Sequence, residues 1–96
     1  MLVIKIIADA FGDTEWAGYL QKYDTSNPDE HGYGRLSVTP DIRMAMKFVD
    51  LIEATTFWKQ QSTSVPYRPD GKPNRPLTSF TITFETVKIA NYAGTN

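Results

Sequence analysis

The stretch Thr78-Ser79-Phe80-Thr81-Ile82-Thr83-Phe84-Glu85-Thr86-Val87 decides the fold. Apolar and polar side chains alternate along it, as they do along a β-strand that buries one face and exposes the other. The pattern places Phe80, Ile82 and Phe84 on the buried side and the intervening polar residues outside. We therefore predict a strand over 78–87.

The run directly before this strand is Tyr67-Arg68-Pro69-Asp70-Gly71-Lys72-Pro73-Asn74-Arg75-Pro76-Leu77. With Pro66 it holds four of the six prolines of the chain, which stiffen the backbone, while its basic side chains point outward. It is predicted to be an ordered loop that joins the helical part of the chain to the last strand. The candidate binding surface consists of loop residues and the preceding helix end, namely Tyr67, Arg68, Lys72, Asn74, Arg75, Trp58 and Lys59.

Two interpretations of this loop remain open from the sequence. Its cations and aromatic side chains can bind phosphates or stack on bases, and loops held by a rigid scaffold often carry function. Alternatively, Asp70-Gly71 forms a tight turn, the prolines lower the entropy of the unfolded loop, and the charges are solvated or paired. The loop is then only a structural connection.

Two helices are expected before the loop. Thr39-Pro40-Asp41 combines a capping residue, a proline at the first helical position and a carboxylate in the first turn. Asp50, followed three residues later by Glu53, is a second cap, so we predict a break near Phe48 to Asp50 and a second helix to about Gln61. The apolar stripe of the first helix is Ile42, Ala45, Met46 and Val49. The buried face of the second is Leu51, Ala54, Phe57 and Trp58.

Three strands are expected before the helices. Leu2 to Asp9 is apolar on both faces apart from Lys5, which is typical of a central strand. Trp16 to Tyr23 is a second strand, with Leu20 and Trp16 chosen as its buried side, and Arg35 to Val38 returns antiparallel to it. The order β-β-β-α-α-β predicts an α+β protein: a two-layer sandwich with helices on one face of a mostly antiparallel sheet of about four strands. A single domain is expected over 1–90, with a flexible tail over 91–96.

The amino-acid composition excludes several classes of function for this protein. The 96 residues contain 41% hydrophobic and 22% charged residues, which is typical of one small globular domain. A net charge of −1 gives no global reason to expect non-specific binding to nucleic acid or acidic membranes. The absence of cysteine excludes disulfides, thiolate catalysis and cysteine-ligated metals. The apolar start has no basic leader or cleavage pattern, so a cytoplasmic protein is expected.

Sites for catalysis, metals and nucleotides are weakly supported. His31 is the single histidine and has no orienting partner or nucleophile in its local sequence. Asp24, Asp29 and Glu30 do not follow the spacing of a calcium-binding loop. Gly32-Tyr33-Gly34 lacks a third glycine and a following helix, so it favours a hairpin turn over a nucleotide loop. We predict no catalytic residues, no metal and no cofactor.

Several segments together resemble a family of small uncharacterised proteins found in bacteriophages, prophages and neighbouring bacterial genomes. The resemblance covers roughly residues 18 to 84. It is carried by Gly18-Tyr19-Leu20, Tyr23-Asp24, Gly32-Tyr33-Gly34, Thr39-Pro40-Asp41, Ala45-Met46-Lys47-Phe48, Glu53-Ala54, Phe57-Trp58 and the run Arg68 to Thr78. The family has no established activity, so no functional residues are carried over. The resemblance implies an accessory protein of a mobile element, which binds host proteins, regulates, or blocks defence.

These observations lead to three functional hypotheses. The first is a non-enzymatic module that binds a protein partner through the loop and the adjacent helix end. The second is an accessory protein that binds nucleic acid through the same basic loop. The third is a hydrolase or transferase, which needs a pocket where polar groups converge, such as His31 with Asp24 or Asp29 facing Arg75. A homodimer is also possible, because a chain this short buries only a thin core.

Overall fold

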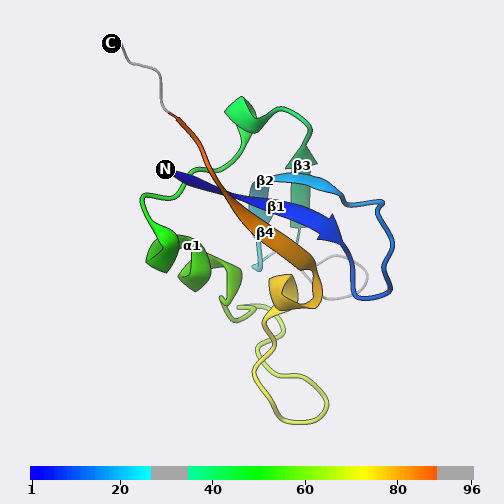
Figure 1. Ribbon diagram of the computed structural model, residues 1–96. Coiled ribbons are helices and arrows are strands. Elements are labelled where there is room, and N and C mark those ends of the chain that lie inside the picture. The colour runs from blue at the N-terminus through cyan, green and yellow to red at the C-terminus, as the bar shows by residue number, and fades with distance from the viewer. Residues whose placement is uncertain (27–34, 89–96) are drawn as a thin grey trace.

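The computed structural model describes residues 1–26 and 35–88. A four-stranded antiparallel sheet has the order β3-β2-β1-β4, and one α-helix occurs in the described part of the chain (Figure 1). The strands are β1 (Leu2–Ala8), β2 (Gly18–Asp24), β3 (Arg35–Thr39) and β4 (Thr81–Thr86). The helix is α1 (Leu51–Trp58), and the short 3₁₀ helices are η1 (Ile42–Met44) and η2 (Pro76–Ser79). The predicted α+β class and four-stranded antiparallel sheet are therefore confirmed.

Strand β1 is central, as its two apolar faces predict. Lys5 lies opposite Tyr19 of β2 on one side and opposite Thr83 of β4 on the other. Both Val3 and Ile4 are fully buried although they point to opposite faces, which explains why the strand is apolar on both sides. The first and last strands of the chain are thus neighbours.

An extended segment, Met46–Phe48, enters the sheet where β1 and β2 separate. Phe48 exchanges two backbone hydrogen bonds of 2.8 Å with Leu2, and the Met46 N–H donates to the Leu20 carbonyl at 2.9 Å. Leu2 also lies opposite Thr86 of β4. The segment therefore satisfies backbone groups on both β1 and β2 at the end where these strands no longer pair with each other.

The core lies between the sheet and α1. Its buried members come from β1, β2, the segment Met46–Phe48, α1 and η2, namely Ile4, Ile6, Leu20, Phe48, Ala54 and Leu77. Phe80, Ile82 and Phe84 are half-buried and pack against this cluster, while Thr81 and Thr83 are exposed. The orientation predicted for the last strand is confirmed, although its regular part covers only 81–86 and η2 replaces its predicted beginning.

The first predicted helix is replaced by the single turn η1. Thr39 is the last residue of β3, and Asp41 is the cap, since its carboxylate accepts the Arg43 N–H at 2.9 Å. The Ala45 N–H closes this turn on the Ile42 carbonyl, and beyond it the chain is extended because the Met46 and Phe48 N–H groups donate to the sheet. The predicted apolar stripe is divided: Ala45 is buried, but Val49 is 67% exposed.

The second predicted helix exists but is shorter than predicted. The Asp50 carboxylate accepts the Glu53 N–H at 2.9 Å, so the predicted cap is confirmed. The Glu53 carboxylate reaches back to the Val49 N–H, one residue before the cap, at 3.0 Å. The helix ends at Trp58, not near Gln61, and Leu51 is exposed, contrary to its predicted place in the core. The two-helix order is thus not confirmed.

The start of the second strand differs from the prediction. Strand β2 begins at Gly18, and Trp16 lies before it with 38% of its surface exposed. Gly18 has a φ of 145°, and a Cβ there would lie 3.2 Å from the Thr39 carbonyl oxygen. Only glycine combines this backbone conformation with such a close approach of β3. Leu20 is fully buried, so that half of the prediction is confirmed.

Some predictions fall outside the described residues. These are the loop residues Asp29, Glu30 and His31, the turn Gly32-Tyr33-Gly34 and the tail 91–96. The boundary between a domain over 1–90 and this tail therefore stays a prediction. Within the described ranges, every helix is too short or too polar to cross a membrane.

Candidate functional site

The proline-rich loop is closed at its neck by backbone hydrogen bonds. Tyr67 and Pro73 form an isolated antiparallel bridge, and the Asn74 N–H donates to the Pro66 carbonyl at 2.9 Å. The Asn74 side chain donates to the Val65 carbonyl at 2.8 Å. The outgoing and returning arms of the loop are therefore held together, and the loop tip projects away from the sheet (Figure 1).

The tip is a tight turn stabilised by Asp70. The Arg68 N–H bonds to the Lys72 carbonyl at 2.8 Å, and the Gly71 N–H bonds to the Arg68 carbonyl at 2.9 Å. Asp70 accepts the Lys72 N–H at 3.0 Å and forms an ion pair with the Arg68 guanidinium at 2.9 Å. Gly71 has a φ of 85°, which a side chain would disfavour. The turn predicted for Asp70-Gly71 is thus present.

Arg75 bonds back to the protein, although the residue as a whole is exposed. Its guanidinium donates to the Lys59 carbonyl at 2.9 Å, directly after the end of α1. Carbonyl groups at a helix C-terminus lack partners within the helix and carry a partial negative charge, so a guanidinium is favourable there. Arg75 therefore fixes the returning arm of the loop to the helix.

Trp58 fixes the same junction from the helix side. Its indole N–H donates to the Leu77 carbonyl in η2 at 3.0 Å, and its ring packs edge-on against Phe84 with centroids 6.3 Å apart. Trp58 is half-buried, so it belongs mainly to the contact between α1, η2 and β4. The Lys59 side chain beside it is exposed.

A buried polar cluster anchors the outgoing arm of the loop to the end of β2. Thr25 is buried, and its hydroxyl oxygen lies 3.0 Å from the Thr63 hydroxyl oxygen. The Thr63 N–H also donates a hydrogen bond to the Thr25 hydroxyl oxygen. Ser62 is almost fully buried, and its N–H donates to the Asn74 carbonyl at 2.8 Å. The loop base is thus bonded to both α1 and the sheet.

The structure divides the predicted surface into two sets. We define the loop tip as residues 67–72, from the bridge at the neck outward; Tyr67, Arg68 and Lys72 are exposed there, and Tyr67 retains 62% of its accessible surface. The side chains of Asn74, Arg75 and Trp58 bond inward at the base. Lys72 is the tip cation whose side chain has no ion-pair or hydrogen-bond partner among the described residues.

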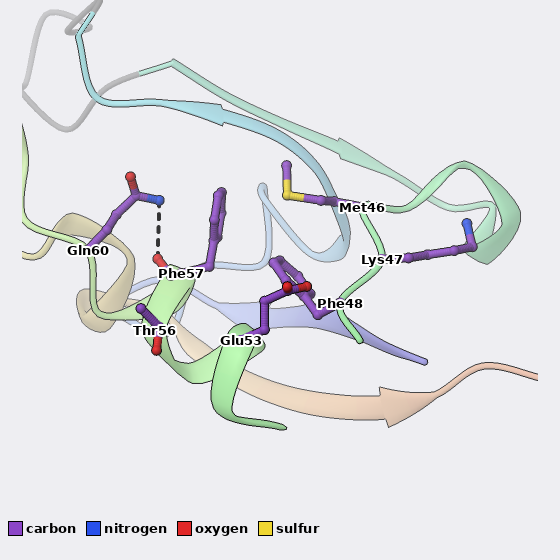
Figure 2. Close-up of a pocket in the computed structure, with 7 residues that line it drawn as sticks. All are labelled: Met46, Lys47, Phe48, Glu53, Thr56, Phe57 and Gln60. Carbon is purple, nitrogen blue, oxygen red and sulfur yellow. Dashed lines mark hydrogen bonds between the residues drawn. The ribbon is translucent and has the colours of Figure 1, made fainter. Parts of the chain in front are cut away.

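A groove that the sequence analysis did not predict lies between α1 and the segment Met46–Phe48. Its volume is about 500 Å³, and its lining residues are Met46, Lys47, Phe48, Glu53, Thr56, Phe57 and Gln60. Figure 2 shows the Phe48 and Phe57 rings between the helix and the extended segment, and their centroids are 5.2 Å apart. The helical spacing of residues 53, 56, 57 and 60 indicates that these side chains share one face of α1, which forms one wall of the groove. The other wall, the extended segment Met46–Phe48, was predicted to be helical, so the groove could not be predicted.

A second unpredicted cluster lies on the sheet face opposite α1. The Tyr19 hydroxyl donates to Glu85 at 3.1 Å, the Lys5 ammonium lies 3.5 Å from the same carboxylate, and Lys5 also lies over the Tyr19 ring. Lys5 lies directly opposite Tyr19, whereas Glu85 lies opposite Val3 and is therefore a diagonal neighbour of Lys5. They stabilise the sheet as cross-strand partners.

Among the residues that the structure describes, the carboxyl groups of Asp24 and Asp41 have lowered pKa values, and both lie outside the loop. Hydrogen bonds from the side chain and backbone of Arg43 hold the pKa of Asp41 below its ordinary value. The Ser26 hydroxyl and N–H lower the pKa of Asp24 in the same way. Both shifts therefore come from local capping bonds at exposed turns.

The described residues include no group of three or more histidine or acidic side chains arranged to hold a metal ion. Arg75, which the enzyme hypothesis placed in a polar pocket, bonds to a helix carbonyl instead. Comparisons with protein-family models, curated proteins and solved structures found no match.

Proposed function

We propose that this chain is a non-enzymatic protein-binding module that contacts its partner through the loop tip. The observation that supports the proposal is a loop closed at its neck and bonded at its base to α1 and β2, with an exposed tip. A segment already fixed in one conformation loses little entropy on binding, so more of the contact energy appears as affinity.

The chemistry of the tip suggests what the partner surface contains. The tip is convex, so the partner offers a hollow. Arg68 is paired with Asp70, whereas the exposed Lys72 is available to pair with a carboxylate of the partner. Tyr67 supplies a rigid aromatic body with a hydroxyl group, which is typical of residues that dominate binding energy. The expected partner is a protein with an acidic concave site.

The wider setting forms part of the same proposal. We place the protein in the cytoplasm as an accessory factor of a phage or mobile element, with a host-interaction, regulatory or anti-defence role. This setting rests on the resemblance of the motif from Arg68 to Thr78 described above. The proposal also treats the fold as two layers, in which α1 covers one face of the sheet and supports the loop.

A double substitution at the tip tests the proposal. Tyr67→Ala with Lys72→Ala removes both tip contacts but none of the bonds at the loop base, so the Tm should change by only a few degrees. Crosslinking and affinity capture in the native host should then lose the partner that the unmodified protein retains. Lys22→Ala is the matched control, because Lys22 is an exposed lysine on β2. A folded double variant that captures every partner would contradict the proposal.

Nucleic acid is the second candidate partner, because Tyr67 and Lys72 are exposed on the same short loop and could stack on a base and contact a phosphate. The other two loop cations are engaged within the protein, which favours the protein partner. Salt titration separates the two candidates. Binding to nucleic acid would weaken steeply as salt increases, because each phosphate contact releases counterions. No shift of labelled DNA or RNA at low salt would exclude this candidate.

A further inference from the structure

A second exposed apolar surface lies at the start of α1, away from the loop tip. Val49 is 67% exposed and Ile52 is 77% exposed, although both are large aliphatic residues. Adjacent exposed aliphatic side chains of this size usually mark a contact surface. Together with Leu51, which lies between them and is 55% exposed, these residues are called the α1 ridge.

The ridge is bonded directly to the groove beside it. The Val49 N–H donates to the Glu53 carboxylate, and the Ile52 carbonyl accepts the Thr56 hydroxyl at 2.8 Å. Glu53 and Thr56 both line the groove (Figure 2). The backbone of the exposed apolar segment is therefore bonded to two side chains that line the apolar groove.

The groove is apolar within and charged at its rim. Its interior is formed by Met46, Phe48 and Phe57, while Lys47 and Glu53 give the rim one positive and one negative charge. Figure 2 shows Lys47 at the opposite end of the groove from Gln60. The charges cancel, so the surface does not select a strongly acidic or strongly basic partner.

Each of the two charged groups at the rim can still form a hydrogen bond with a partner. The Lys47 ammonium donates to the Arg43 and Ala45 carbonyls, which leaves one of its three donors without a partner among the described residues. One Glu53 oxygen accepts the Val49 N–H, and the other has no partner in the same part of the chain. A partner surface with the same pair of charges in reverse order would satisfy both.

We propose that the occupant of this surface is a second copy of the chain. A two-fold axis places each α1 ridge in the groove of the other copy and brings Lys47 of each copy to Glu53 of the other. Such an interface uses the same patch twice, and this patch contains both complementary shapes and both signs of charge. The patch is small compared with a stable dimer interface, so we expect reversible dimerisation with a dissociation constant in the micromolar to millimolar range.

Sedimentation equilibrium of the full chain over a range of concentrations tests the proposal. The unmodified protein should change reversibly from monomer to dimer. Ile52→Asp should raise the dissociation constant by about 100-fold or more, because the two-fold axis places the new charge in both grooves. Val65→Asp is the matched control: Val65 is an aliphatic residue at the base of the loop, is 40% exposed and belongs to neither the ridge nor the groove. It should change the constant by less than about threefold.

A labelling experiment locates the contact without altering charge. The chain has no cysteine, so Ile52→Cys introduces the only thiol. Its alkylation should slow as protein concentration rises, whereas the thiol of Val65→Cys should react at a constant rate. A chain that stays monomeric at about 1 mM overturns the proposal. So does a dimer that Ile52→Asp and Val65→Asp affect equally. Loop-tip variants should leave this dimer intact, so its test is independent of the proposed function.

Discussion

At the scale of single residues, Arg68 and Arg75 show that equal charges in one loop have different tasks. Arg68 pairs with Asp70 two positions away, so its contact depends on the local turn. Arg75 bonds to a carbonyl sixteen residues earlier, at the end of α1. The first contact follows from the Asp-Gly turn in the sequence. The second depends on how helix and loop meet in space, and no local pattern indicates it.

Replacement of Arg75 should destabilise the junction of helix and loop. Arg75→Ala leaves the Lys59 carbonyl without its donor, and we expect the free energy of unfolding to fall by about 1 kcal/mol. Urea unfolding followed by far-ultraviolet circular dichroism measures the change. Arg68→Ala is the matched control and should cost less than about 0.5 kcal/mol, because an exposed ion pair contributes little. Equal losses for the two variants would contradict the assigned role of Arg75.

The Asp41 carboxyl should make the free energy of unfolding decrease at acidic pH. Because Arg43 holds its folded pKa below the unfolded value, the stabilising effect is complete above about pH 4 and decreases as pH falls through the folded pKa. Asp41→Asn retains a capping side chain but cannot titrate. We expect the urea midpoint of this variant to fall less than that of the unmodified protein below about pH 4. Identical acid profiles would show that the pair with Arg43 is not coupled to folding.

At the scale of elements, the segment from Thr39 to Phe48 shows where local signals fail. Proline, a capping carboxylate and helically spaced apolar residues all favour a helix there. The region between β1 and β2, however, offers backbone partners to an extended chain, and Met46 and Phe48 bond to them. Tertiary hydrogen bonds thus override helix propensity after a single turn. The strands and the cap of α1 were predictable because their determinants lie within a few residues of each other.

The cap of α1 should be important, because a helix of two turns has little stability alone. Asp50→Ala removes the acceptor of the Glu53 N–H, and we expect a loss of about 1 kcal/mol in the free energy of unfolding. Asp50→Asn should retain most of the stability, since asparagine caps nearly as well. Chemical denaturation of both variants measures this difference. If alanine and asparagine were equivalent, packing alone would determine where the helix begins.

At the scale of the whole molecule, alternation and residue order predict the α+β class, the antiparallel sheet and the central place of β1. They do not predict the groove, because one of its walls is extended where a helix was expected. The tip of the loop was predictable as an exposed turn, whereas the inward bonds of Trp58, Asn74 and Arg75 were not. Each of these side chains bonds to a distant or irregular segment, and the spacing of residues in the sequence does not indicate such a contact.

The pairing of β1 with β4 affects how the protein forms during synthesis. The first strand leaves the ribosome early, but one of its two neighbours lies about 80 residues later. Until β4 emerges, one edge of β1 can pair with other chains. We therefore expect a chain that ends at residue 80 to remain unfolded and to aggregate, and its amides to exchange with solvent without protection. Addition of a synthetic peptide that spans 78–88 should restore protection in β1, which would show that the fold requires completion of the central strand.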